Sequence, residues 1–156
     1  MENTLLLIKP NATEQNAVGR ILAMAEENNM VIQKLRMFNF TDEIAQNFYA
    51  EHVGREFYEP LMKFMKSGKT VGVVLSGDNA VKNLRALLGN TNPEEANPGT
   101  VRALFGENTR RNACHGSDSA ESAKREISLI FLEYVFINKN KDGLTWFKRF
   151  TKLSGE

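Results

Sequence analysis

The sequence predicts a two-layer α/β sandwich in a single domain. Two observations point to this class. Short apolar runs at residues 4–9 (TLLLIK) and 70–76 (TVGVVLS) are typical of strands covered on both faces, and stretches with apolar residues at helical spacing separate them. The 156 residues suit one domain, which at this size buries roughly 68–70% of the unfolded chain's surface. A genuine core is therefore expected.

The first part of the chain alternates strands and helices. The strand at residues 4–9 is closed by Pro10, and apolar residues at i, i+3, i+4 and i+7 over 18–25 predict a helix. Residues 31–40 are rich in β-branched and aromatic side chains and read as a second strand. Thr41 is expected to cap a short helix after it.

The middle of the chain continues the alternation and then changes character. Pro60 suits the first turn of a helix that ends before the strand at 70–76. Asp78 is expected to cap the next helix, and Gly89 to end it. Residues 89–112 are rich in Gly, Asn, Thr and Pro, with a helical turn at 101–105. Loops of this length are usually functional or disordered.

The composition excludes several classes of protein. There are 20 Lys and Arg against 19 Asp and Glu, a formal net charge of +1, so nothing global marks a nucleic-acid or anionic-membrane binder. A single Cys makes no internal disulfide. The apolar run in the first ten residues, MENTLLLIKP, is too short for a signal peptide or a membrane span. We expect a cytoplasmic protein whose anion sites are local.

The stretch RNACHGSDSAES, residues 111–122, places His115 just before a predicted helix. Asp118 and Glu121 have the spacing of a capping box. Glu126 lies on the flank of the buried stripe of that helix, where its carboxylate can fix the tautomer of a histidine ring and make the other nitrogen more nucleophilic. The alternative is that His115 is a hydrogen-bonded turn residue.

Cationic and hydroxyl-bearing residues elsewhere favour the chemical interpretation. Together they could form a phosphate cradle, because Arg matches phosphate oxygens bidentately and Lys supplies a compact charge; individually they could be solvated. Tyr49 and Phe57 could pack in the core or offer a platform for a base. The sequence has neither a P-loop nor a GxGxxG motif. The cradle candidates are Lys9, Arg85, Thr91, Arg102 and Asn112.

Several motifs, in order over about residues 4–130, resemble one enzyme family. They are LLLIKPNA, FYAEH, REFYEPL, LRALLGNTNPEEA, PGTVRA and RNACHGSDSAESAKREI. This set is similar to the nucleoside diphosphate kinases. The resemblance implies a ferredoxin-like α+β sandwich, with a four-stranded antiparallel sheet, helices on one face, and further helices and a loop around a nucleotide site. The kinase domain would span residues 1–133, with His115 on a short last strand near 112–116.

The resemblance also implies a role for each matched residue. His115 would take the γ-phosphoryl group of a nucleoside triphosphate as a phosphohistidine and pass it to a nucleoside diphosphate. Glu126 would orient its ring, and Ser117 would help to hold it. Phe57 would stack on the base with Leu61 beside it and Thr109 on the far side. The matched positions expected to contact phosphates, ribose or the moving phosphoryl group are Lys9, Tyr49, Arg85, Thr91, Arg102 and Asn112.

Cofactor and partners follow from the same resemblance. Mg²⁺ would be held mainly by the nucleotide phosphates, with Asp118 assisting through water. The family forms homo-oligomers, tetramers or hexamers built from dimers, and needs neither membrane nor nucleic acid. Asn11-Ala12 stands where Asp-Gly is common in the family, a variation familiar among bacterial members. Thr109 occupies a position that is often apolar.

Two other functions are compatible with parts of the sequence. His-Gly near Arg110 and Arg111 loosely matches a histidine phosphatase, although Ala113 and Cys114 intervene. A ferredoxin-like sheet could bind RNA, although no run of Gly and aromatics of the RNA-binding type is present. The tail, residues 134–156, is expected to pack on the domain or a neighbouring subunit through Trp146, Phe150 and Leu153, which are spaced as an apolar helical stripe. That expectation comes from periodicity alone.

Overall fold

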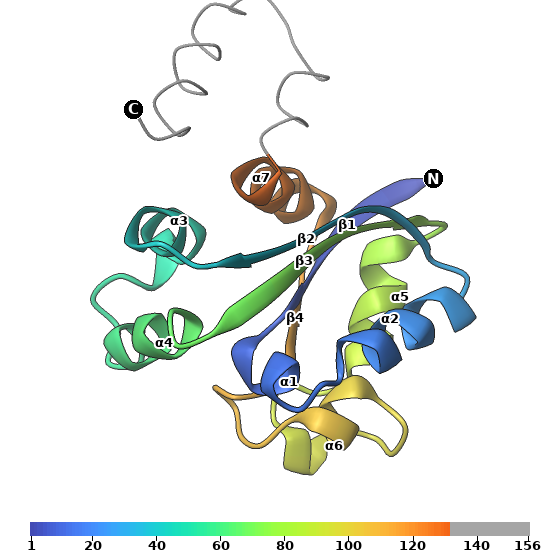
Figure 1. Cartoon of the computed structure of the whole chain (residues 1–156). Coiled ribbons are helices and arrows are strands. Elements are labelled where there is room, and N and C mark those ends of the chain that lie inside the picture. The colour runs from blue at the N-terminus through green and yellow to red at the C-terminus, as the bar shows by residue number, and fades with distance from the viewer. Residues whose placement is uncertain (132–156) are drawn as a thin grey trace, which may run out of the picture.

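The central feature of the computed structural model, which describes residues 1–131, is a four-stranded antiparallel sheet (Figure 1). Its strand order is β2-β3-β1-β4. The predicted sheet is confirmed, and so is the short strand that carries His115. The strands are β1 (Glu2–Ile8), β2 (Val31–Asn39), β3 (Lys69–Gly77) and β4 (Cys114–Gly116). The tail expectation, with Trp146, Phe150 and Leu153, falls outside the described residues.

Helices follow nearly every strand, as the sequence predicted. Their bounds are α1 (Pro10–Glu14), α2 (Val18–Glu27), α3 (Asp42–Phe48), α4 (Tyr58–Met65), α5 (Ala80–Leu88), α6 (Val101–Phe105) and α7 (Ala120–Ile130), with short 3-10 turns at Ala50–His52 and Pro93–Glu95. None of the helices within residues 1–131 is long and apolar enough to cross a bilayer.

The apolar run of β1 is explained by two core clusters, one on each face of the sheet. Leu6 and Ile8 pack with residues of α2 and α5, whereas Leu5 and Leu7 pack with residues of α3, α4 and α7. Successive side chains of a strand point to opposite faces, so a strand that is covered on both faces buries both sets of side chains and favours apolar residues throughout. Figure 1 shows α2 and α5 on one side of the sheet and α3, α4 and α7 on the other. From periodicity, the sequence predicted only a two-layer sandwich of strands and helices.

Helix ends show which local signals were correct. Thr41 caps α3, its hydroxyl accepting from the backbone N of Ile44 at 3.2 Å, as predicted. Gly89 ends α5 with φ of 84°, a conformation that favours glycine. The expectation for Asp78 was wrong, because Asn79 is the N-cap residue of α5 and makes no side-chain cap. The carboxylate of Glu2 instead accepts from the backbone N of Val81 at 2.9 Å.

Candidate active site

His115 lies at the middle of β4, opposite Leu7 of β1. Its Nε2 is 2.8 Å from Oε2 of Glu126, which comes from α7 and is buried. An ionised carboxylate accepts, so the ring proton sits on Nε2 and the lone pair is on Nδ1. The hydroxyl of Ser117 donates to the same Glu126 oxygen at 2.8 Å and accepts from the backbone N of Leu5 at 3.3 Å. The histidine ring is thus oriented by a carboxylate that is itself held.

The backbone before His115 takes an uncommon turn. Ala113 has φ of 72°, and the backbone N of Cys114 donates to the carbonyl of Asn112 at 2.9 Å. A three-residue turn with a positive central φ is a strained γ-turn, and strain of this kind costs on the order of 1–3 kcal/mol and clusters at functional sites. The sequence does not predict this γ-turn, because alanine has no preference for a positive φ.

The start of α7 lies beside His115 and differs from the expected capping box. Ser119 is the N-cap residue, with its hydroxyl accepting from the backbone N of Ser122 at 3.0 Å. Asp118 lines the cavity instead, and its carboxylate accepts a hydrogen bond from the hydroxyl of Ser122. That bond, the largest cause, lowers the pKa of Asp118. The residue therefore carries a negative charge at neutral pH.

Lys9 and its neighbours form the cationic part of the site. The ammonium of Lys9 is buried and donates to Oδ1 of Asn112 at 2.8 Å. Burial, and secondly the charge of Arg102, lower the pKa of Lys9 to about 8. The amide of Asn112 donates to the backbone carbonyls of Thr91 and Thr109, each at 3.1 Å. Lys9 is therefore fixed in direction and close to losing its proton at mildly alkaline pH.

Two arginines complete the positive charge, in contrasting surroundings. Arg102 is buried and donates to the carbonyls of Gly89 at 2.8 Å and Cys114 at 2.9 Å. Its Nε is buried with no partner among the described residues, and burial lowers the pKa of Arg102. Arg85 is exposed on α5 and has one long bond, 3.5 Å, to the carbonyl of Gly116.

Aromatic side chains form the opposite part of the site. Tyr49 is buried, and within residues 1–131 its hydroxyl has no hydrogen-bond partner. Burial, followed by the charge of Glu126, raises the pKa of Tyr49, so the hydroxyl stays protonated. His52 stands between Tyr49, at 6.2 Å between ring centroids, and Phe57, at 5.1 Å. Phe57 is 43% exposed and offers an open ring face.

The residues singled out from the sequence meet in one cavity of about 470 Å³. Eleven of them line it: Lys9, Tyr49, Phe57, Leu61, Arg85, Thr91, Arg102, Thr109, Asn112, His115 and Asp118. Glu126 and Ser117 contact His115 and are buried behind it. His52 and Arg110 also line the cavity and were not predicted as lining residues from the sequence. The FYAEH motif contains His52, and Arg110 lies in the Arg-Arg pair before the His115 motif, so both signals were present.

Comparisons with known proteins agree on one family. The family model for nucleoside diphosphate kinase matches residues 2–135. A nucleoside diphosphate kinase of Actinobacillus pleuropneumoniae serotype 3 is 49% identical over 131 residues, which are 84% of this chain and 95% of that protein. One from Methanococcus maripaludis is 47% identical, over 84% of this chain and 98% of that protein. The crystal structure of the Aquifex aeolicus nucleoside diphosphate kinase matches with a TM-score of 0.81 at 44% identity, covering 83% of this chain and 94% of that one.

Proposed function

The chain belongs to the nucleoside diphosphate kinase family, and from this premise we propose which of its residues perform the reaction. The enzyme transfers the γ-phosphoryl group of a nucleoside triphosphate to a nucleoside diphosphate through a phosphohistidine. The observation that carries our assignment is the pair of His115 Nε2 and Glu126 Oε2 at 2.8 Å, on a ring that lines the cavity. The family membership favours this enzyme over the phosphatase and RNA-binding alternatives.

His115 acts as the nucleophile. With the proton held on Nε2 by Glu126, the lone pair of Nδ1 attacks the γ-phosphorus. The bond from that phosphorus to the β,γ-bridging oxygen breaks, and its electron pair leaves with the nucleoside diphosphate. An acceptor diphosphate then enters the same cavity and its β-phosphate oxygen takes the phosphoryl group from Nδ1. One nucleotide site therefore serves both half-reactions, which is the ping-pong scheme.

Lys9, Arg85 and Arg102 stabilise charge on the phosphates. Phosphoryl transfer depends on positioning and electrostatics more than on covalent help from the protein. Tyr49 and Arg102 line the cavity, and two of their buried donors, the Tyr49 hydroxyl and the Nε of Arg102, have no partner among the described residues. Asn112 holds Lys9. Thr91 adds a hydroxyl at the cavity wall.

The base is held by stacking rather than by hydrogen bonds. Phe57 presents an exposed ring, Leu61 is buried beside it in α4, and both line the cavity. Thr109 also lines the cavity and lies on the loop before β4. A π-face is common to all bases, so this wall predicts broad base tolerance.

Mg²⁺ fits the donor set as a nucleotide-borne ion. Among the described residues that line the cavity, Asp118 is the only carboxylate, and no group of three His, Cys, Asp or Glu within residues 1–131 could hold a metal. Mg²⁺ is commonly bound by one or two carboxylates together with substrate phosphates. When bound, the ion neutralises phosphate charge, and Asp118 would hold it through water.

A labelled-phosphate experiment tests these assignments. The protein is incubated with γ-labelled ATP and Mg²⁺, washed free of nucleotide, and then given GDP. We expect acid-labile, alkali-stable label on the wild-type protein, transferred to GTP on addition of GDP. Release of inorganic phosphate without GTP would contradict the kinase assignment. Label retained by a His115→Ala variant would contradict the choice of nucleophile.

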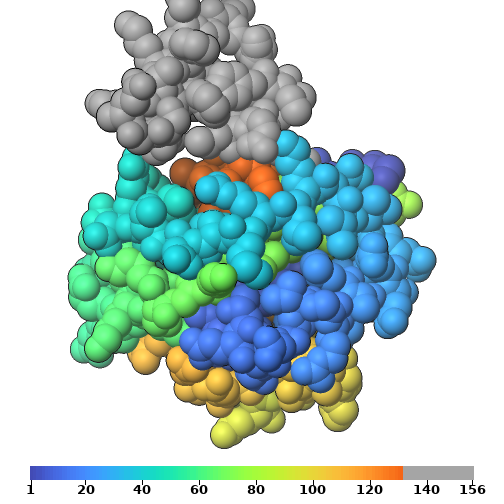
Figure 2. All heavy atoms as spheres, in the orientation of Figure 1, coloured from blue at the N-terminus to red at the C-terminus, as the bar shows by residue number. Residues whose placement is uncertain are grey.

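We also propose that the chain forms a homo-oligomer, a tetramer or a hexamer built from dimers. β2 is an edge strand, and within residues 1–131 no strand lies beside its outer side. Val31, Leu35 and Met37 on it are 50%, 54% and 54% exposed. Figure 2 shows the β2 region as a light-blue to cyan band across the visible face. An exposed apolar edge strand is a template for pairing with another chain.

Sedimentation tests the assembly. We expect the wild type to sediment as a tetramer or hexamer and Leu35→Lys to shift toward smaller species, because a charge on this edge opposes pairing. Lys82→Ala, at an exposed position of α5, is the control and should sediment as the wild type. A monomeric wild type would contradict the proposal.

A cytoplasmic location is the simplest for an enzyme that uses free nucleotides, and we propose it here. Cell fractionation with an antibody against the chain tests it, and recovery in a membrane fraction would contradict it.

A further inference from the structure

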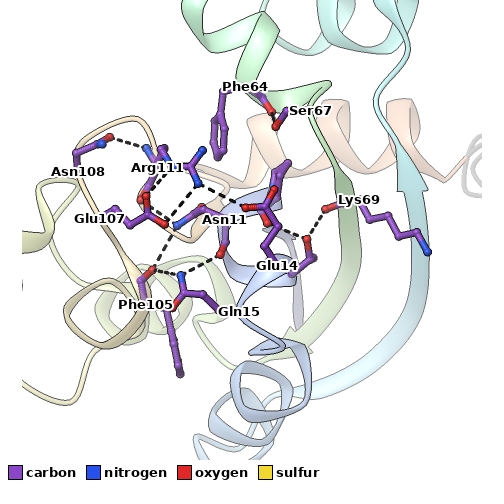
Figure 3. Close-up of polar contacts among 12 residues, drawn as sticks. Asn11, Glu14, Gln15, Phe64, Ser67, Lys69, Phe105, Glu107, Asn108 and Arg111 are labelled. Carbon is purple, nitrogen blue, oxygen red and sulfur yellow. Dashed lines mark hydrogen bonds and ion pairs between the residues drawn. The ribbon is translucent and has the colours of Figure 1, made fainter.

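Asn11 in α1 holds a segment that is about a hundred positions away in the chain. Its side-chain amide donates to the carbonyls of Phe105, at 3.3 Å, and Arg111, at 3.0 Å. Asn11 is fully buried. The amide of Gln15, one turn further along, donates to the same Phe105 carbonyl at 3.0 Å. Figure 3 shows these side chains of α1 pointing toward the loop. Both ends of the segment 105–111 are therefore tied to α1.

The segment is also closed upon itself. The backbone N of Glu107 donates to the carbonyl of Arg111 at 2.7 Å, and Oδ1 of Asn108 accepts from the backbone N of Arg111 at 2.8 Å. The Arg111 guanidinium contacts Glu107 at 2.6 Å and Glu14 of α1 at 3.5 Å, and lies 5.1 Å from the centre of the Phe64 ring. The loop thus behaves as one unit whose position depends on α1.

This unit carries one wall of the nucleotide cavity. Thr109 and Arg110 line the cavity, and Asn112, which directly follows the segment 105–111, accepts from the Lys9 ammonium. Lys9 is in turn the residue that precedes α1. The same short helix therefore follows the cation that we assign to phosphate binding and holds the loop that lines the cavity.

From this geometry we infer that Asn11 is a positioning residue for nucleotide binding, acting by holding the 105–111 loop through its side-chain amide. The inference rests on the proposed function, because it takes the cavity to be the nucleotide site. In this chain a donor is needed at position 11, since both partners of the Asn11 amide are carbonyl oxygens. An asparagine supplies two N–H groups, whereas an ionised aspartate supplies none.

Asn11→Asp turns this requirement into a measurement. A carboxylate buried opposite two carbonyl oxygens has a raised pKa and regains one donor when it is protonated. The KM for GDP, divided by that of the wild type at the same pH, should be raised on the order of tenfold at about pH 8 and recover as the pH falls toward about 6. The turnover at saturation should change less than the KM, because His115, Glu126 and Ser117 lie on other elements.

The charged groups around Asn11 must be separated from this effect. They are Lys9 just before α1, Glu14 at its end, Arg111 and Glu107 in the loop, and Lys69 at the start of β3, whose carbonyl accepts from Thr13. Asn11→Ala keeps all of them, so its KM ratio should be raised at every pH without recovery. If Asn11→Asp does not fold at the higher pH, the Asn11→Ala KM and turnover still decide the inference.

Thr13→Val is the matched control for a merely structural role. Its hydroxyl also anchors α1, but to the carbonyl of Lys69 at 2.8 Å rather than to the loop. It should lower the melting temperature without changing the KM for GDP. Equal KM values in Asn11→Ala, Asn11→Asp and wild type would overturn the inference, as would a KM rise in Thr13→Val of the same size. An inactive wild type would instead refute the proposed function.

Discussion

The two walls of the cavity are built differently. The wall that carries His115 is formed by β4 and the residues that lead into α7, and behind it Glu126 of α7 accepts from both His115 and Ser117. The other wall carries Thr109 and Arg110 and lies on a loop that side-chain to backbone bonds tie to α1. A nucleophile needs one fixed orientation, which regular structure supplies, whereas a substrate wall must admit and release a ligand.

Two residues that line the cavity carry unpaired buried donors. The hydroxyl of Tyr49 and the Nε of Arg102 lack hydrogen-bond partners within the described part of the chain. Leaving such a buried donor without a hydrogen bond costs about 1–3 kcal/mol, so native proteins retain unpaired donors where another group satisfies them. We therefore expect changes at the His115 wall to affect the chemistry, and changes at the other wall to affect binding.

The largest expected effect is at His115, the proposed nucleophile. His115→Ala should lower transfer by more than about 10⁴-fold, since removing a nucleophile from a catalytic set leaves little of its function. Nucleotide binding and the melting temperature should stay close to wild type, because the ring is partly exposed and its loss leaves the phosphate contacts in place. Initial rates with ATP and GDP, with equilibrium dialysis of ADP, measure both. A variant that turned over normally would remove the distinction between the walls.

The two arginines should share a catalytic effect and differ in stability. Loss of either should lower turnover on the order of 10²–10³, by analogy with removal of one preorganised donor. Arg102→Ala should also lower the melting temperature, because two backbone carbonyls, those of Gly89 and Cys114, lose their partner. Exposed Arg85 makes a single long bond, so Arg85→Ala should melt as the wild type does. Unchanged turnover in Arg85→Ala would exclude it from phosphate binding.

Glu126→Gln sharpens the role of the buried carboxylate. The amide keeps the volume but loses the charge that holds the proton on Nε2 of His115, so transfer should slow about 10–100-fold, the usual range for groups that orient a reacting ligand. The KM for GDP should change less than the turnover. Pre-steady-state labelling by γ-labelled ATP isolates the step. An effect confined to KM would place Glu126 with the substrate wall.

Because of Lys9, activity should fall at alkaline pH. Its pKa is about 8, below its ordinary value because of burial, so kcat/KM should fall up to about tenfold per unit as pH rises above about 8. The thiol of Cys114, with its pKa raised by burial to about 12, does not titrate there. Between about 8 and 10.5 the unfolded chain binds more protons at Lys9, so this residue's contribution to stability rises with pH. The pH profile of Lys9→Arg should lack this alkaline decrease in kcat/KM. If the profile of the variant were identical to that of the wild type, the decrease would belong to another group.

The predictability of the two walls from sequence also differs. His115, Ser117 and Glu126 are close in sequence, and the helical stripe of α7 places Glu126 beside the strand, so their grouping follows from periodicity and a motif. The capping residue was missed by one position, since Asp118 and Ser119 are both good caps and the contact to Ser122 divides between them. Local signals identify an element reliably and its ends less so.

The other wall could not be derived in this way. Asn11 meets Phe105 and Arg111 across 94 and 100 positions, and no spacing rule connects residues so far apart. The positive φ of Ala113 is imposed by its surroundings, because alanine does not favour it. The helical layer formed by α3, α4 and α7 on the second face was also beyond periodicity, which identifies helices without assigning them to a face.

The smallest expected effect is discrimination among bases. Phe57 offers an exposed ring face, and stacking engages a π-face that every base has, so ADP, GDP, CDP and UDP should all serve as acceptors, with kcat/KM values within about tenfold of one another. Phe57→Ala should raise all four KM values by similar factors, and Phe57→Tyr, which keeps the ring, should raise none. Competition between pairs of diphosphates for phosphorylated enzyme measures the ratios directly. Acceptance of purines alone would mean that a hydrogen-bonding residue such as Thr109 reads the base, and the substrate wall would then be as specific as the nucleophile wall is rigid.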